Sequence, residues 1–363
     1  MTLALTTAGE SHGPALVAIL TGLPAGLVLD RAAIDHDLHR RQQGYGRSAR
    51  QRIEHDEVEV LGGLRHGRTL GTPLGLVVRN RDHDNWAWGM SPWPPDGEAH
   101  GKGTEPVTVA RPGHADLAGA LKYGLRDTRD ALERASARHT AVTVAAGAVA
   151  KTLLAAIGVT VAGTVVEIGG ETDEQAQREA TDSARADRDT LGGIVEVSAT
   201  GVPPGLGSYA TRDDRLDARL AAALMGIQAV KAVELGAGAE LARRRGSDAH
   251  DEIVPGLRRT TNRAGGVEGG VSNGEPVVVR AAMKPLPTLM RPLGTVDLAS
   301  GERAQALVER SDVAAVEALA VVAEAAVAWE LARAAREKFG GDSLDDFVAA
   351  HRAYLERIPW RPH

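Results

Sequence analysis

A short cationic turn lies just before a long apolar stretch in the middle of the chain. Arg134, Ser136 and Arg138 come directly before an Ala- and Val-rich segment that runs from about residue 140 to residue 157. Alanine is the strongest helix former, so this segment predicts a mostly buried helix. Free backbone N–H groups at a helix N-terminus and nearby guanidinium groups both attract anions. With His114 upstream, the pattern is typical of a site for a phosphorylated ligand or cofactor.

Two other segments combine residue types that can transfer protons or hold anions. Residues 9–13 read GESHG, which places Ser11 and His12 in a glycine-bounded turn. A histidine can transfer protons near neutral pH, but a polar turn after a strand accounts for this pattern equally well. The basic segment from Arg40 to Arg52 fits a clamp for the phosphate or carboxylate groups of a small ligand, a nucleic-acid patch or a solvated surface.

The composition excludes several classes of protein and site. The 363 residues contain no cysteine, which excludes a disulfide framework, a cysteine–metal site and a thiol nucleophile. The net charge of −6 argues against a surface designed as a whole for nucleic acid, so we predict no nucleic-acid partner. No window approaches the roughly 20 apolar residues of a membrane span, and Glu10 and His12 interrupt the N-terminus before a signal peptide can develop. We therefore expect a cytoplasmic protein without a membrane partner.

Two triplets of acidic residues and histidine are the remaining candidates for metal ligands. Residues 35–37 and residues 82–84 both read DHD. Adjacent side chains seldom converge on one ion, and the first triplet falls on a predicted helix, where its side chains point apart. We therefore predict two polar surface clusters and no protein-bound metal.

The hydrophobic periodicity predicts helices and strands in irregular alternation. Helices are expected at residues 30–42, 140–157, 213–227, 312–339 and 343–357. Strands are expected at residues 3–7, 15–20, 74–78, 159–168, 193–199 and 277–281. Asp30 and Asp312 are the expected N-caps of their helices. Residues 80–105 predict a long irregular segment, and residues 171–189 an exposed excursion.

The organisation of these elements favours one layered domain. No linker or composition break divides the chain, so we predict a single intertwined domain over residues 1–363. The irregular alternation favours an α+β or α/β layered sandwich over a regular parallel sheet. A cationic motif followed by a long Ala-rich helix occurs twice, at Arg134 and at Arg310, which indicates an internal pseudo-duplication.

Nine short motifs occur in a fixed order over almost the whole chain. They are AGESHG (8–13), RRQQGYGR (40–47), NRDHDNW (80–86), RPGHAD (111–116), ERASAR (133–138), MGIQAVKAVELG (225–236), NRAGGVEGG (262–270), MKPLPT (283–288) and ERSD (309–312). In this order they resemble the chorismate synthase family. The resemblance implies an anti-1,4-elimination of phosphate from 5-enolpyruvylshikimate 3-phosphate that requires reduced FMN. It also implies a β-α-β sandwich with helices between the sheets, assembled as a homotetramer.

The resemblance implies a role in the reaction for five residues. His12 is expected to be the acid that meets the departing phosphate, and His114 the imidazole beside the flavin that manages its protonation. Asp312 is expected near flavin N5, where it helps that nitrogen take the proton from the substrate ring. Ser11 and Ser136 match positions proposed to support proton relay.

Further positions match binding residues of the family. By this resemblance the flavin-binding residues are Arg134, Ala135, Ser136, Gln228, Ala229, Gly269, Lys284, Pro285, Leu286, Pro287, Thr288 and Arg310. The residues expected to bind the anionic substrate or NADP are Arg41, Arg47 and Arg138. Reduced FMN is the expected cofactor, and NADPH is a candidate reductant.

The chemistry of the implied substrate accounts for these residue types. A polyanion favours arginine forks over lysine point charges. Fixed cations and a protonated histidine stabilise the charge on a leaving phosphate more in the transition state than in the bound substrate. Breaking an unactivated ring C–H bond needs an electron-rich partner, which a reduced flavin provides and no side chain does. Residues 44–52 and 80–105 are candidate lids that exclude oxygen and water.

The sequence departs from the family pattern at two positions. His139 stands where members often carry glutamate, which changes the local charge, and Pro287 stands where serine is common, which removes a hydroxyl contact to flavin. No extra region indicates a built-in flavin reductase, so we expect reduced flavin to come from an external source.

Two other functions stay open on sequence grounds. One is a flavin-binding protein of this fold that has lost the elimination, although the intact His12, His114 and Asp312 argue against it. The other is a nucleic-acid-binding protein that uses the basic segment from Arg40 to Arg52, for which binding should weaken steeply with salt.

Overall fold

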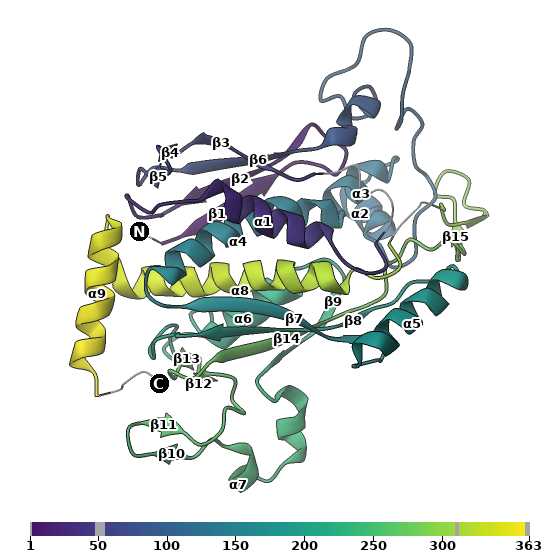
Figure 1. The fold of residues 1–363 in the computed structure, drawn as a ribbon. Coiled ribbons are helices and arrows are strands. Elements are labelled where there is room, and N and C mark those ends of the chain that lie inside the picture. The colour runs from purple at the N-terminus through teal and green to yellow at the C-terminus, as the bar shows by residue number, and fades with distance from the viewer. Residues whose placement is uncertain (1, 48–54, 309–311, 360–363) are drawn as a thin grey trace.

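Two antiparallel sheets with helices between them form the centre of the computed structural model, which describes residues 2–47, 55–308 and 312–359 (Figure 1). The strand order is β1-β2-β6-β3 in the first sheet and β7-β8-β14-β9 in the second. The strands of the first sheet are β1 (Ala4–Ala8), β2 (Ala15–Thr21), β3 (Val58–Gly62) and β6 (Leu74–Arg79). Those of the second are β7 (Thr160–Ile168), β8 (Gly193–Thr200), β9 (Val230–Leu235) and β14 (Val277–Met283). The mixed α+β class is confirmed.

Both sheets follow one order of elements along the chain. In the first, the pair β1–β2 precedes α1 (Arg31–Gln42), then β3 and β6, and finally α4 (Thr140–Ala155). In the second, β7 and β8 precede α6 (Leu216–Met225), then β9 and β14, and finally α8 (Val316–Phe339). The last of the four strands pairs between the second and third in each sheet. Helix α5 (Glu174–Ala186) is inserted between β7 and β8 and has no counterpart in the first sheet.

Helices α4 and α8 pack closely at the centre because small residues lie between them. A Cβ atom on Gly147 of α4 would come within 2.3 Å of the Cβ of Ala325 on α8. Only glycine therefore fits at this crossing. Around it, Val149, Leu153 and Leu331 are fully buried. The two backbones approach closely, and aliphatic side chains fill the space around them. The core is therefore densely packed although it contains few aromatic rings.

The predicted N-cap is confirmed at α1 but not at α8. Asp30 accepts a hydrogen bond from a backbone N–H of the first turn of α1, and Ser343 forms a capping box at the start of α9 (Leu344–Arg357). Helix α8 begins at Val316 and has no side-chain cap. The predicted N-cap role of Asp312 is therefore wrong, because this residue lies before the helix and forms an ion pair at the cavity described below.

Four α-helices of the described residues were not predicted, and one of them is the single turn α7 (Gly246–Ala249). Helix α5 (Glu174–Ala186) occupies the region predicted only as an exposed excursion, and Asp173 caps it. Helices α2 (Asp116–Tyr123) and α3 (Arg129–Ala135) precede α4. Both are short, and short helices depend on tertiary packing rather than on their own propensity.

The remaining elements are short. They are β4 (Leu64–Arg65), β5 (Arg68–Thr69), β10 (Ile253–Val254), β11 (Arg258–Arg259), β12 (Val267–Glu268), β13 (Val271–Ser272), β15 (Gly294–Val296), β16 (Arg303–Gln305), α7 (Gly246–Ala249) and 3-10 turns at Arg81–Asn85, Ala137–His139 and Gly238–Arg243. The segment 80–105 is otherwise irregular, as predicted. Among the helices of the described residues, none is both long and apolar enough to cross a membrane.

Candidate active site

A cavity of about 630 Å³ lies between the segments that precede α4 and α8. Its volume is in the usual range for a ligand pocket. Most of the residues predicted from the sequence line it: Ser11, Arg41, Arg47, His114, Ala135, Ser136, Arg138, Gln228, Ala229, Lys284, Leu286, Pro287, Thr288 and Asp312. Residues far apart in the chain, from both sheets and their helices, therefore meet at one site.

Some predicted residues do not line this cavity. His12, Arg134 and Pro285 are neighbours in sequence of lining residues but are not themselves part of its wall. Gly269 lies at the turn between β12 and β13, away from the lining residues. Arg310 falls outside the described residues, as do Arg50 and Arg52 of the basic segment.

Two cationic residues of the cavity wall were missed. Arg111 and Lys231 both line the cavity. Each belongs to a motif that was noticed, RPGHAD for the first and MGIQAVKAVELG for the second. The positive charge of Arg111 and Lys231 within these motifs could have marked them as candidates. Motif spacing alone, however, does not show which residues of a motif face a ligand.

A buried carboxylate fixes the ring of His114. Asp116 begins α2, is fully buried, and accepts hydrogen bonds from the backbone N–H of Arg111 at 3.0 Å and from its Nε at 2.8 Å. His114 Nδ1 contacts the other oxygen of Asp116. Burial alone would raise the pKa of Asp116, but the hydrogen bonds from His114 and Arg111 outweigh it and hold the pKa well below its usual value. The ionised carboxylate thus binds Nδ1 and leaves Nε2 for chemistry in the cavity.

Two arginines of the wall are held by one buried carboxylate. Asp56 lies 2.7 Å from Arg41 Nη2 and 2.6 Å from Arg138 Nη1. Asn80 accepts a further hydrogen bond from Arg138 Nε at 2.8 Å. Burial would raise the pKa of Asp56, but the charges and hydrogen bonds of the two arginines lower it overall. These contacts fix both guanidinium groups before any ligand arrives, which reduces the reorganisation that binding requires.

A second ion pair at the cavity wall joins residues from the two halves of the chain. Arg47 Nη1 lies 2.8 Å from the Asp312 carboxylate. The Nε atoms of Arg47 and Arg41 are buried and have no hydrogen-bond partner among the described residues. Buried donors without a protein acceptor are uncommon, so both atoms fit a site in which a ligand supplies oxygen atoms.

Two lysines add positive charge to another part of the wall. Lys284 donates a short hydrogen bond from Nζ to the carbonyl oxygen of Gly113, which precedes His114. Burial, and then the charge of Lys231, lower the pKa of Lys284. The cavity is therefore rich in cations, which suits a ligand that carries several negative charges.

Two hydroxyl groups lie side by side at the cavity. Ser136 Oγ donates to Ser11 Oγ over 3.2 Å and also accepts from the backbone N–H of Arg138. Both serines line the cavity. The pair brings the turn that contains His12 into direct contact with the segment before α4.

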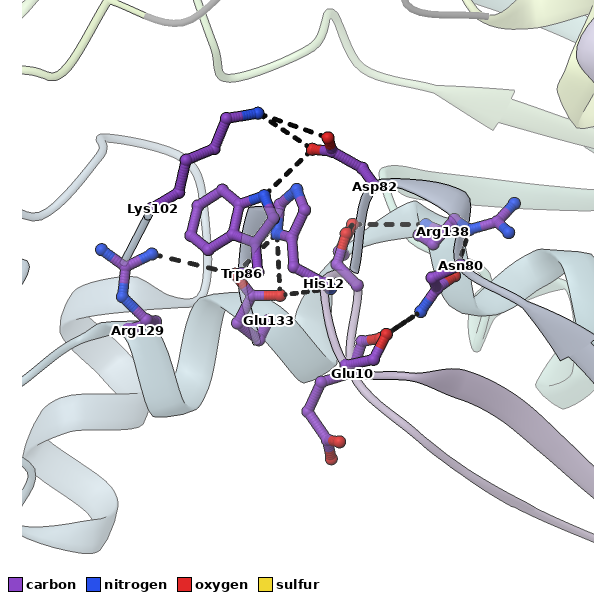
Figure 2. Close-up of polar contacts among 12 residues, drawn as sticks. Glu10, His12, Asn80, Asp82, Trp86, Lys102, Arg129, Glu133 and Arg138 are labelled. Carbon is purple, nitrogen blue, oxygen red and sulfur yellow. Dashed lines mark hydrogen bonds and ion pairs between the residues drawn. The ribbon is translucent and has the colours of Figure 1, made fainter. Parts of the chain in front are cut away.

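His12 follows Ser11 in the chain and is in contact with Glu133 and Trp86 (Figure 2). Glu133 of α3 accepts from His12 Nδ1 at 2.8 Å and from the His12 backbone N–H at 2.9 Å. The ring of Trp86 stacks on the imidazole with a centroid separation of 4.0 Å. Only 12% of the His12 side chain is exposed. His12 is thus one residue removed from the cavity wall, in a defined environment of its own.

Arg134 and His139 both contact the end of β1. The Arg134 guanidinium donates to Thr7 O, Thr7 Oγ1 and Gly9 O over 3.0–3.1 Å. His139 Nε2 lies 2.9 Å from Thr7 Oγ1. Burial, and then the charge of Arg134, lower the pKa of His139 to about 4. His139, which departs from the family pattern, therefore adds an uncharged ring at neutral pH. The flavin contact expected of Arg134 stays a prediction.

The described arginines of the basic segment face internal carboxylates. Arg40 forms two hydrogen bonds to Glu324 at 2.9 Å, while Arg41 and Arg47 bind the carboxylates named above. Guanidinium groups used in this way do not form a continuous surface for phosphates, which disfavours a nucleic-acid patch. Within residues 2–47, 55–308 and 312–359, no group of three or more His, Asp or Glu side chains has the arrangement of a metal site.

Comparison with known proteins points in one direction. The chorismate synthase family model matches residues 3–335. A chorismate synthase from Desulforudis audaxviator is 54% identical, with 97% of each chain covered. One from Rubrobacter xylanophilus is 52% identical over 99% of this chain and 98% of its own. A crystal structure of chorismate synthase has a TM-score of 0.78 and 37% identity, and the match covers 99% of both chains.

Proposed function

The chain belongs to the chorismate synthase family, and from that premise we propose that its cavity is the site of the family's lyase reaction. The reaction is the anti-1,4-elimination of phosphate from 5-enolpyruvylshikimate 3-phosphate, which gives chorismate. The observation that supports this site best is that His114, Asp312 and the arginines expected to bind the substrate line one cavity.

The residues of the cavity fit reduced FMN as the cofactor. The two unpartnered arginine Nε atoms and the lysine pair can bind anionic or carbonyl oxygens, and Leu286, Ile227 and Met283 add apolar wall for a flat ring system. We propose that the segment Lys284–Thr288, Gln228 and Ala229 hold the cofactor. Reduced FMN, when bound, supplies the transient electron density that no side chain here can provide.

The arginines are suited to bind the substrate phosphate and to stabilise it as it leaves. Arg41 and Arg138 are fixed by Asp56, and Arg47 is fixed by Asp312. Cations held in place before the reaction stabilise developing negative charge without further reorganisation. We propose that these three residues bind the anionic groups of the substrate, and that NADP binding, where it occurs, uses the same arginines.

His114 is suited to hold or move a proton at Nε2. Its Nδ1 is bound by ionised Asp116, which keeps the ring in one orientation. We propose that His114 manages protonation at the cofactor and that Asp312 assists in receiving the ring proton. Ser11 and Ser136 form a hydroxyl pair between the His12 turn and the cavity, and we propose that they support proton relay.

One anaerobic assay tests the proposed function. The purified protein is mixed with 5-enolpyruvylshikimate 3-phosphate and photoreduced FMN under anaerobic conditions, and chorismate is followed by absorbance and chromatography. Chorismate formation that depends on reduced FMN is expected. A protein that binds FMN but forms no chorismate would instead be a flavin-binding relative without the lyase activity. A parallel reaction with oxidised FMN and NADPH tests our proposal that the reduced flavin comes from an external source.

Three further features belong to the same proposal. We propose a homotetramer, a single domain over residues 1–363, and an origin of the fold by internal duplication. The shared strand order of the two sheets supports the duplication. A long apolar helix follows each sheet in the chain, α4 after the first and α8 after the second, and these two helices pack against each other. A cytoplasmic location stays a prediction.

A further inference from the structure

We propose that Glu133 is a positioning residue for His12, and that it fixes the ring so that Nε2 is the nitrogen that gives its proton to the departing phosphate. The inference rests on the proposed function, because it takes His12 as the acid that meets the departing phosphate, the role that the resemblance to the family implies. Glu133 is the first residue of the ERASAR motif, and neither the motif nor its spacing assigns it a role.

The contacts of Glu133 with His12 fix both the backbone and the ring. The carboxylate accepts from the His12 backbone N–H at 2.9 Å through Oε2. It accepts from the ring Nδ1 at 2.8 Å through Oε1 and at 3.1 Å through Oε2. Only 1% of the Glu133 side chain is exposed. A carboxylate so deeply buried needs partners, and His12 provides most of them.

An aromatic ring covers one face of the imidazole. Trp86 stacks on His12 with an interplanar angle of 18°, and its Nε1 donates to Asp82 at 3.0 Å. Lys102 pairs with the same Asp82 at 3.1 Å, as Figure 2 shows. These contacts prevent the ring from turning away from Glu133, so the carboxylate acts on an imidazole of fixed orientation.

The nearest cation to Glu133 is a weaker partner. Arg129 lies one turn earlier on α3, and its Nη1 is 4.0 Å from Glu133 Oε1. That distance is longer than a hydrogen bond. The Arg129 guanidinium instead lies over Trp86, 5.2 Å from the ring centroid. The short contacts of the carboxylate are thus with His12.

This arrangement assigns the two ring nitrogens of His12. Nδ1–H donates to the Glu133 carboxylate, which accepts the hydrogen bond and takes no part in the proton transfer. In the elimination, the bond between the substrate carbon and the phosphate oxygen breaks, and its electron pair stays on the phosphate. The Nε2–H bond of the imidazolium then breaks and a new O–H bond forms on the phosphate, with the proton passing directly or through the Ser11 and Ser136 hydroxyls between the His12 turn and the cavity. Glu133 acts through the position of the ring and does not touch the substrate.

A double-mutant cycle tests the proposal with turnover as the readout. The variants are Glu133→Ala, His12→Ala and the double variant. We expect Glu133→Ala to lower kcat about tenfold with little change in KM, because binding groups are untouched. In the His12→Ala background, Glu133→Ala should change kcat by less than about twofold. An equal loss in both backgrounds would overturn the proposal, since Glu133 would then act independently of His12.

A conservative variant and a matched control separate positioning from folding. Glu133→Gln keeps an acceptor oxygen of the same reach, so it should recover much of the activity that Glu133→Ala loses. Glu330 of α8 does not line the cavity, is also buried and pairs with Arg219 of α6, so Glu330→Gln controls for the loss of a buried carboxylate. Thermal melts accompany each variant. If Glu330→Gln lowers kcat as much as Glu133→Ala, the positioning role is refuted.

A second readout does not depend on turnover. In histidine-labelled protein at about pH 8.5, where an ordinary imidazole is neutral, nitrogen NMR identifies the protonated ring nitrogen. The His12 signal, assigned by its loss in His12→Ala, should show Nδ1–H in the wild type and a tautomer mixture in Glu133→Ala. An unchanged signal overturns the proposal. Absence of chorismate from the wild-type assay would refute the proposed function, while this spectrum would still decide whether Glu133 places the proton.

Discussion

His114 and His12 are held in the same way but by different parts of the chain. In both, a buried carboxylate binds Nδ1. For His114 the carboxylate is Asp116, two residues later in one motif and at the start of one helix. For His12 it is Glu133, which is 121 residues away. The first arrangement is built locally, whereas the second exists only once α3 has packed against the turn after β1.

The difference extends to what surrounds each ring. His114 lines the cavity and shares its carboxylate with Arg111. His12 lies outside the lining and is covered by Trp86, which comes from the irregular segment 80–105. A change near His114 should therefore affect the cavity directly. A change near His12 should act through the placement of one ring, and its effect should be smaller.

The largest effect is expected for His114→Ala. Loss of a group that moves protons in the cavity should lower kcat by about 10²-fold or more. FMN should still bind measurably, because the segment Lys284–Thr288 and the arginines remain. Stopped-flow assays under anaerobic conditions and an FMN titration measure the two quantities. Near-normal turnover would refute the role proposed for His114 and would remove the contrast with His12.

Asp116→Asn should have the next largest effect. It removes the charge that holds both His114 Nδ1 and Arg111 Nε. Turnover should fall about tenfold or more, because the ring loses its fixed orientation. Loss of the negative charge beside the buried Arg111 guanidinium should also lower stability, by up to about 3–5 kcal/mol. Assays and denaturant unfolding measure both effects.

A matched control for this variant is Asp251→Asn. Asp251 also accepts hydrogen bonds from backbone N–H groups, those of Arg263 and Ala264, but does not line the cavity. It should lower stability without the loss of kcat. If both variants lower kcat equally, Asp116 acts only through the fold, and the proposed similarity between the two histidine sites fails.

Trp86→Ala should have a moderate effect limited to the His12 site. An aromatic pair contributes about 0.5–1.5 kcal/mol beyond the area it buries, so a poorly held ring should lower kcat about three- to tenfold. The affinity for FMN should stay unchanged, because Trp86 does not line the cavity. Trp93→Ala is the control, since Trp93 lies in the same irregular segment and is 78% exposed. A similar loss in Trp93→Ala would show that the segment matters as a whole and not through the stacked ring.

The same contrast explains how much could be predicted from the sequence. RPGHAD is a motif that carries its own partners, and its residues Arg111, Gly113 and His114 line the cavity. The helix with a local cap at Asp30 was also predicted. The long apolar helices were also predictable, because their burial repeats along the chain. Helix caps, short motifs and hydrophobic periodicity depend on residues close together in the chain, so they can be recognised from the sequence.

The features that failed depend on distant residues. Asp312 has the residue type of an N-cap, but Arg47 from the first half of the chain binds it instead. For Arg134 the contacts to Thr7 and Gly9 at the end of β1 had no signal in the sequence, while its expected flavin contact stays a prediction. Glu133 gave no signal at all, because its partner His12 belongs to another motif. Tertiary packing decides which side chain pairs with which carboxylate. Such pairs produce no periodic pattern in the sequence.

The smallest effect, and the last test of the comparison, concerns a third histidine. His139 supports the strand before the His12 turn through Thr7 and lacks a carboxylate partner among the contacts observed in the described chain. Thr7 Oγ1 accepts from Arg134 and lies 2.9 Å from His139 Nε2, and the guanidinium charge so close to the ring disfavours its protonated form. With the His139 pKa lowered from 6.5 to about 4, the unfolded chain binds more protons than the folded one between these values. Stability should therefore fall as the pH decreases through this window, and the part due to His139 should vanish in His139→Gln.

Melting temperatures at pH 7 and at about pH 4.5 measure this difference for the wild type and the variant. Other acidic groups titrate in both proteins, so only the difference between the two slopes reports on His139. A smaller acid-induced loss in His139→Gln is expected. An equal loss would mean that the ring is not held neutral. The absence of a carboxylate partner would then not distinguish His139 from His12 and His114, whose Nδ1 atoms each contact a buried carboxylate.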